Sequence, residues 1–157
     1  MIYTDLTKQA MRISFDGHFG QYDRGKVPYI CHPLHIAEEM PDETKTLIAL
    51  LHDVLEDTRL TEEDLLRYGF PARVVEAVKI LTRDREVPYA RYIEGLICSG
   101  NEDAMFVKLA DLRHNMDETR AEHGKLPKYL SERYRLAYQM ISEALEKQQE
   151  EKNGSEE

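Results

Sequence analysis

The chain has 157 residues, and its 30 acidic and 21 basic side chains give it a formal net charge of −9. That length fits one domain, and an acidic chain without a Lys- and Arg-rich stripe argues against a protein that binds nucleic acid. The two cysteines form no CxxC pair and the N-terminus lacks a basic segment followed by a long apolar run, so we expect a cytoplasmic protein with free thiols and no membrane partner.

Helical periodicity runs through the whole sequence and predicts an all-α fold, a compact helical bundle. No run of alternating β-branched residues indicates a sheet. We expect one domain over residues 1–148 and a flexible charged tail over 149–157. The predicted helices, in chain order, are 3–15, a short one near 33–40, 43–56, 61–68, 71–81, 88–99, 102–117 and 128–148.

The third predicted helix carries an unusual polar face in the stretch LIALLHDVLEDT, residues 47–58. On a wheel of ~100° per residue with His52 at 0°, Glu56 falls at ~40°, Asp53 at ~100° and Asp57 at ~140°. The leucines, Ile48 and Val54 fall on the opposite side. The helix therefore has one apolar face for the core and one face of histidine and carboxylates.

A solvated surface is the usual explanation for such a face. However, the face holds no Lys or Arg, so Asp53 and Asp57 repel each other. A divalent cation would relieve this repulsion, and adjacent His and Asp offer the ligands that Mn, Fe or Zn accept. Further ligands would have to come from elsewhere, and the candidates are His32 in PYICHP and Asp111 in VKLADLRHN, with Asn115 one turn beyond Asp111.

Three motifs, PYICHP, LLHDVLEDT and VKLADLRHNM, occur in this order. Together they resemble the HD-domain metal-dependent phosphohydrolases, and most of all the Rel/SpoT-type (p)ppGpp hydrolase domains and their small single-domain relatives. The resemblance covers roughly residues 1–120. It implies a helical fold of the HD-domain type with one divalent metal ion, often Mn²⁺. The metal ligands that it implies are His32, His52, Asp53 and Asp111.

The resemblance also implies roles for residues around the metal. Glu56 and Asp57 would act on the attacking water as catalytic residues, and Asn115 and Arg24 would help to hold the nucleotide. Lys26, in the loop DRGKVP, is a further candidate for substrate binding by its place in the motif order. Both loop cations can equally be solvent-exposed charges without a role.

The expected function is metal-dependent hydrolysis of a phosphorylated nucleotide, with the 3′-pyrophosphate of (p)ppGpp-like guanosine polyphosphates as the best single substrate. The alternatives are hydrolysis of another nucleotide, a non-catalytic nucleotide-binding sensor and a purely structural bundle. One departure bears on the choice. Asp117 and Glu118 stand where the long bifunctional enzymes have Arg-Thr, and two negative charges facing the substrate would disfavour a tetraphosphate.

Overall fold

The computed structural model describes residues 1–154, and in that range the chain forms helices joined by loops, with one isolated β-bridge between Tyr22 and Pro28. The prediction of an all-α fold is therefore confirmed. Each of these helices is either too short or too polar to span a bilayer. In chain order they are α1 (Asp5–Gly17), α2 (Cys31–Glu38), α3 (Glu43–Leu51), α4 (Val54–Asp57), α5 (Glu62–Arg67), α6 (Ala72–Leu81), α7 (Tyr89–Cys98), α8 (Glu102–Met116), the 3₁₀ turns η1 (Glu118–Arg120) and η2 (Glu122–Gly124), and α9 (Lys128–Gly154).

Side-chain caps fix where several helices begin. The side chain of Asp42 accepts a hydrogen bond from the backbone N–H of Lys45 at the start of α3. Thr61 and Asp64 form the predicted capping box at the start of α5, and Asn101 caps α8. Each such cap satisfies backbone donors that the first turn leaves unpaired and contributes about 1 kcal/mol.

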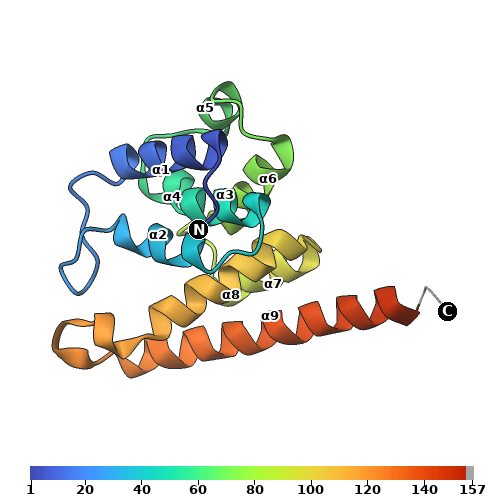
Figure 1. Ribbon diagram of the computed structural model, residues 1–157. Helices are drawn as coiled ribbons and strands as arrows, with labels where there is room; N and C mark the ends of the chain where they lie inside the picture. Colours follow the sequence, from blue (N-terminus) through green and yellow to red (C-terminus); the bar gives the residue numbers. More distant parts are fainter. Residues whose placement is uncertain (155–157) are drawn as a thin grey trace.

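Helix α3 lies inside the bundle, where it packs against α1, α2, α6 and α8 (Figure 1). The side chains from Leu47 to Leu51 are all at most 1% exposed. Burying a large apolar side chain contributes roughly 1.5–3 kcal/mol, so this helix is a main source of stability. Residues attached to its C-terminal end therefore have a rigid support.

The helix predicted over 43–56 is wrong in one respect, because the structure divides it into α3 and α4. His52 keeps helical angles, but Asp53 has φ −104° and ψ −2°, which lies between the helical and extended regions. The apolar pattern continues across the division because Val54 is also fully buried. Hydrophobic periodicity alone could not reveal this break.

Helix α9 runs antiparallel to α8 along one side of the bundle, and its far end extends beyond the other helices (Figure 1). It buries Leu130, Ala137 and Ile141. The predicted end at residue 148 is wrong, because the helix continues to Gly154. The predicted flexible tail is thus helical up to that residue, and its remainder, 155–157, lies outside the described residues. Gln, Glu and Lys, which fill this segment, are good helix formers.

Candidate metal centre and adjoining cavity

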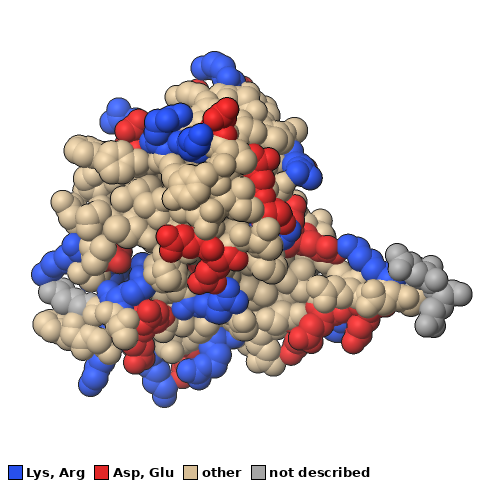
Figure 2. All heavy atoms as spheres, in the orientation of Figure 1, with Lys and Arg blue, Asp and Glu red and all other residues tan. Residues whose placement is uncertain are grey.

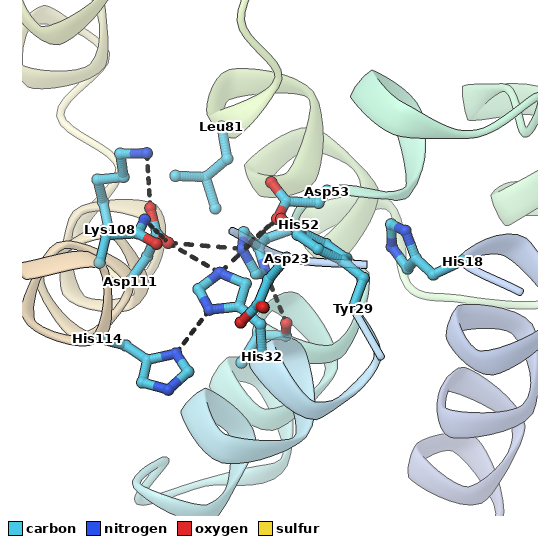
Figure 3. Close-up of polar contacts among 12 residues, drawn as sticks. His18, Asp23, Tyr29, His32, His52, Asp53, Leu81, Lys108, Asp111 and His114 are labelled. Atoms are coloured by element: carbon cyan, nitrogen blue, oxygen red, sulfur yellow. Dashed lines mark hydrogen bonds and ion pairs between the residues drawn. The ribbon is translucent and has the colours of Figure 1, made fainter. Parts of the chain in front are cut away.

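Four side chains from separate elements meet at one point, as Figure 3 shows. His32 comes from α2, His52 from the end of α3, Asp53 from the break before α4, and Asp111 from α8. His32 Nε2 lies 3.0 Å from Asp111 Oδ1 and 3.8 Å from Asp53 Oδ2. His52 Nε2 lies 2.9 Å from Asp53 Oδ2 and 3.9 Å from Asp111 Oδ1. The structure therefore brings together all four predicted ligands, here called the ligand cluster.

The break after α3 allows two consecutive residues to point at the same centre. In a regular helix, neighbouring side chains diverge by ~100°. At the break, Asp53 departs from regular helical angles, and its carboxylate lies 2.9 Å from His52 Nε2. Tyr29, from the loop before α2, donates a hydrogen bond from Oη to Asp53 Oδ2 and fixes the carboxylate in this position.

Hydrogen bonds on the outer side of each imidazole orient the two histidines. His52 Nδ1 lies 2.7 Å from the carbonyl oxygen of Ala49, to which it donates. His52 Nε2 is buried and lies 2.9 Å from Asp53 Oδ2, at an angle that does not make a hydrogen bond. His32 Nδ1 lies 2.6 Å from Nδ1 of His114. Histidines that bind metals usually have one ring nitrogen held by a neighbouring group and the other free to face the metal. His32 and His52 follow this arrangement, with Nδ1 held and Nε2 facing the carboxylates.

The charges of the ligand cluster favour a cation at its centre. Burial opposes a proton on His52, but Asp53 and Asp111 outweigh burial and raise its pKa to about 9. Burial would raise the pKa of Asp53, yet His52 lowers it below its usual range. Two imidazole nitrogens and two carboxylate oxygens are a donor set that suits Mn²⁺, Fe²⁺ or Zn²⁺, so the residues present fit a divalent metal ion. Among them, His32, His52 and Asp53 have ligand atoms within 4.8 Å of one another.

Two other residues of α8 hold the Asp111 carboxylate, one at each oxygen. Lys108 Nζ donates to Asp111 Oδ2 at 2.7 Å, and Asn115 Nδ2 donates to Asp111 Oδ1 at 2.6 Å. Burial raises the pKa of Asp111, but Lys108 and His32 outweigh it and lower that pKa well below its usual range. Lys108 was not among the residues predicted from the sequence. Its spacing of three residues before Asp111 was the available signal, because side chains three apart on a helix are neighbours.

A cavity of about 390 Å³ opens beside the ligand cluster, and its walls come from the loop before α2, the α3–α4 break, the α6–α7 connection, α8, the loop after α8, and α9. Glu56 and Asp57 of α4 both line it. Glu56 Oε2 accepts a hydrogen bond from the backbone N–H of Arg83 at 3.0 Å, and Asp57 Oδ1 lies 3.3 Å from Arg85. Burial raises the pKa of both carboxyl groups, as expected of groups that exchange protons.

The predicted substrate-binding residues are not equally placed. Arg24 and Asn115 line the cavity, whereas Lys26 is exposed and lies outside the residues that line it. Lys26 has a positive φ of 63°, which directs the backbone of this loop through a tight turn. Besides Lys108, sequence reasoning missed two further cations of the cavity wall, Arg83 and Arg120. Both lie in irregular segments, where no periodicity relates them to the motifs.

Asp23 and Arg120 join the two loops at the mouth of the cavity. Asp23 Oδ1 accepts hydrogen bonds from the backbone of Gly25 and Val27, and Asp23 Oδ2 lies 3.2 Å from Arg120 Nη2. The backbone of Gly25 lies so close to η1 that a Cβ there would be 2.2 Å from the carbonyl oxygen of Arg120. Only glycine fits this approach.

Asp117 and Glu118, which replace the Arg-Thr of the long bifunctional enzymes, lie in the same loop. Asp117 lines the cavity, but its carboxylate caps η1 by accepting a hydrogen bond from Thr119 N at 2.9 Å. Hydrogen bonds from Thr119 lower the pKa of Asp117. Glu118 is exposed and lies outside the cavity-lining residues. One of the two extra negative charges therefore faces the cavity, with one of its oxygens already engaged.

On the face shown in Figure 2, Lys and Arg side chains are interspersed with Asp and Glu rather than gathered in one continuous patch. The same mixture occurs in the cavity, where Arg24, Arg83, Lys108 and Arg120 stand among carboxylates. Local cations, and not the net charge of the chain, thus determine which part of the cavity can receive an anion.

Comparison with known proteins identifies relatives of this chain. It is 37% identical over 121 residues, 69% of its length, to the bifunctional (p)ppGpp synthase/hydrolase SpoT of Escherichia coli K12, of which it covers 17%. It is 36% identical over 117 residues, 66% of its length, to the guanosine-3′,5′-bis(diphosphate) 3′-pyrophosphohydrolase of Haemophilus influenzae, of which it covers 17%. The chain spans about a sixth of the length of these curated relatives. The resemblance predicted from the three motifs is confirmed, although no family model matches the chain.

A solved structure shares the fold. It comes from a study titled "A metazoan ortholog of SpoT hydrolyzes ppGpp and plays a role in starvation responses", and it matches with a TM-score of 0.72 at 20% identity. The match covers 92% of this chain and 88% of the other. The prediction of a helical fold of this type is therefore confirmed.

Proposed function

Since the chain is a relative of the Rel/SpoT-type (p)ppGpp hydrolases, we propose that it is a metal-dependent phosphohydrolase of a phosphorylated nucleotide, and that its substrate is a (p)ppGpp-like guanosine polyphosphate cleaved at the 3′-pyrophosphate. The observation that supports this most directly is the ligand cluster beside a cavity, in which the Nε2 atoms of His32 and His52 and the carboxylates of Asp53 and Asp111 face one another within 4 Å. We assign the activity to the single domain predicted over residues 1–148, because the residues that line the cavity run from Tyr22 to Tyr134.

The proposed metal ion is Mn²⁺, held by the four side chains of the ligand cluster. When bound, a divalent ion supplies Lewis-acid chemistry, which activates water near neutral pH and polarises a phosphoryl oxygen. The cluster supplies two neutral imidazoles and two carboxylates. Tyr29 and Ala49 keep Asp53 and His52 in place through the hydrogen bonds described above.

Glu56 is proposed to accept the proton of the attacking water. Its carboxylate lines the cavity one turn beyond His52, and burial together with the nearby Asp53 and Asp57 charges raises its pKa. A base with a raised pKa holds a transferred proton better than an exposed glutamate does. Asp57, which also lines the cavity and is paired with Arg85, is proposed to orient the water or to assist the leaving group.

Arg24 and Asn115, which both line the cavity, are proposed to hold the nucleotide. Arg24 is supplied by the loop that Asp23 and Arg120 fix, and Asn115 by the last turn of α8. Lys26 is proposed only as a charge that attracts the anionic substrate toward the cavity mouth, because it does not line the cavity.

The deciding experiment is a screen of nucleoside 3′- and 5′-phosphates with purified, Mn²⁺-loaded protein. The proposal expects release of pyrophosphate from ppGpp, and faster than phosphate release from guanosine 3′- or 5′-monophosphate. Turnover of a different nucleotide would keep the reaction class and replace the substrate. Tight nucleotide binding with no product on long incubation would replace the enzyme by a nucleotide-binding sensor.

A further inference from the structure

The loop between α1 and α2 contacts both ends of the short helix α4. At one end, the Tyr29 hydroxyl donates a hydrogen bond to Asp53, the residue before α4. At the other end, Gln21 Nε2 donates to the backbone carbonyl oxygen of Asp57, the last residue of α4, at 2.8 Å. The backbone N–H of Tyr29 also donates to the carbonyl oxygen of Gln21 at 2.9 Å, which joins the two loop residues. We call Gln21 and Tyr29 the α4 clamp.

A helix as short as α4 depends on support from outside. It has four residues, and a single helical turn is unstable by itself because it fixes several backbone angles for one hydrogen bond. The backbone N–H of Asp57 donates to the carbonyl oxygen of Asp53 at 2.9 Å. The α4 clamp thus holds the two residues that this hydrogen bond joins. Glu56 stands between them in the chain, so the position of its carboxylate depends on both contacts.

His18 supports both residues of the α4 clamp. The carbonyl oxygen of Asp57 can only accept a hydrogen bond, so the amide nitrogen of Gln21 must face it. The amide oxygen of Gln21 then faces His18 Nδ1 at 2.8 Å, and this nitrogen must carry a proton in order to donate. His18 is 2% exposed, and the centres of the His18 and Tyr29 rings lie 4.9 Å apart (Figure 3). A buried histidine therefore sets the orientation of the Gln21 amide and packs against Tyr29.

Gln21 reaches α4 from a second cavity, which has a volume of about 720 Å³. Gln21 lines this second cavity and lies outside the described residues that line the cavity beside the ligand cluster. Glu56 and Asp57, in contrast, line both cavities. The proposed substrate would occupy the cavity beside the ligand cluster, where Gln21 does not reach. Any effect of Gln21 on the reaction must therefore be exerted through the position of the two acids.

We propose that Gln21 is a positioning residue, which holds α4 so that Glu56 and Asp57 keep their places at the reaction site, and that His18 orients its amide. This inference rests on the proposed function, in which the two acids act on the attacking water. A displacement of positioned groups by about 1 Å can cost roughly 100-fold in rate. Loss of the Gln21 hydrogen bond should therefore lower kcat, whereas KM and Mn²⁺ affinity depend on other residues and should be retained.

The variant Gln21→Glu tests this role selectively. A carboxylate keeps an acceptor for His18 Nδ1 but has no N–H to donate to the carbonyl oxygen of Asp57. Amide hydrogen exchange measured by NMR should show the Asp57 N–H exchanging about tenfold faster, the value of one hydrogen bond, with the amides of α3 unchanged. For the nucleotide that the wild type hydrolyses, kcat should fall about 10- to 100-fold, with KM and Mn²⁺ affinity within about twofold.

The matched control is Gln9→Glu. Gln9 Nε2 donates to the backbone carbonyl oxygen of Tyr68 at 3.1 Å, so this variant loses the same kind of hydrogen bond between α1 and the end of α5. It should leave kcat and the exchange of the Asp57 amide at wild-type values. Gln21→Met, which lacks the amide and adds no charge, is the second variant and should reproduce both effects of Gln21→Glu.

Two results would overturn the inference directly: unchanged exchange at Asp57 in both Gln21 variants, or wild-type kcat despite faster exchange. Equal losses in Gln9→Glu would overturn it as well, because the effect would then follow from any such bond lost near α1. If the wild type hydrolyses no nucleotide, the proposed function fails. Faster exchange at Asp57 in Gln21→Glu would then still support the α4 clamp, and unchanged exchange would contradict it.

Discussion

The ligand cluster and the loops at the cavity mouth differ in burial and in the elements that carry them. His32, His52 and Asp111 are each 3% exposed and are carried by helices that pack against the core. Arg24 and Lys26, in contrast, are exposed on a loop that is tied to its neighbour by Asp23 and Arg120. The candidate metal ligands thus have rigid support, whereas the residues proposed to meet or attract the substrate lie where the sequence can change without unfolding the core.

The largest expected effect is the loss of a ligand from the cluster. Asp53→Ala should weaken Mn²⁺ binding by about 100-fold or more and remove turnover. The substitution removes one of the two negatively charged ligands proposed for the metal ion. Metal content after dialysis and nucleotide hydrolysis measure this. Asp5→Ala, an exposed carboxylate of α1, is the control. Retention of stoichiometric Mn²⁺ by Asp53→Ala would show that the metal is held elsewhere.

A change one turn further along should separate chemistry from metal binding. Glu56→Gln should lower kcat by about 10²–10⁴, the usual contribution of a general base, and leave Mn²⁺ affinity unchanged. Burial raises the pKa of Glu56. As the pH falls, the wild type should therefore begin to lose activity at a higher pH than the pKa of a free glutamate. Glu63→Gln, on the exposed side of α5, makes the same charge change. Wild-type kcat in Glu56→Gln would remove Glu56 from the mechanism.

The cluster should also respond to pH in a way that the loops do not. The metal-free protein holds a proton on His52, whose pKa is raised from 6.5 to about 9 by Asp53 and Asp111 against the effect of burial. This proton contributes stability that is complete below pH 6.5 and is lost as the pH rises through about 9. A metal must displace it, so apparent Mn²⁺ affinity should rise by up to about tenfold per pH unit below pH 9. Calorimetry in buffers of different ionisation enthalpy would count the released protons, and a value of zero would contradict this account.

The smallest effect should come from the loops. Gly25→Ala places a methyl group 2.2 Å from the carbonyl oxygen of Arg120, which must push the two loops apart. We expect KM to rise about tenfold, less than the ~100-fold cost of a 1 Å misplacement of positioning groups, with Mn²⁺ affinity unchanged. Gly95→Ala in α7 is the control, since its Cβ would meet nothing within 4 Å. An equal loss of Mn²⁺ binding in Gly25→Ala would show that the two regions are not independent.

The same comparison explains what the sequence could and could not predict. The polar face of residues 47–58 and the acid inside the apolar helix 102–117 made His52, Asp53 and Asp111 candidates, and the resemblance of the three motifs to the HD-domain phosphohydrolases implied the full set with His32. Arg83 was not predicted to line the cavity, because it lies between α6 and α7 in a segment whose position depends on tertiary packing and not on a repeating pattern. Residues 149–154 were predicted to be flexible on the basis of charge, but the helix propensity of Gln, Glu and Lys favours continuation of α9.

The break at Asp53 escaped prediction for a related reason. Leu51 and Val54 are both fully buried, so the core is continuous across the point where the helix is interrupted. A wheel assumes constant rotation per residue and so separated His52 from Asp53 by ~100°. The wheel represents neither the break in the backbone nor the rotation of the side chains, and the ligand atoms of the two residues lie 2.9 Å apart.

The order in which these parts occur along the chain has a consequence for biosynthesis. The last member of the ligand cluster is residue 111, whereas the cavity is completed by Tyr134 of α9. Chains emerge from the ribosome N-terminus first, so a nascent chain can assemble its cation site before its anion-binding cavity has closed. A metal ion could then bind before the last stage of folding and stabilise the folded chain by mass action. The order of α8 and α9 along the chain therefore determines the order of assembly.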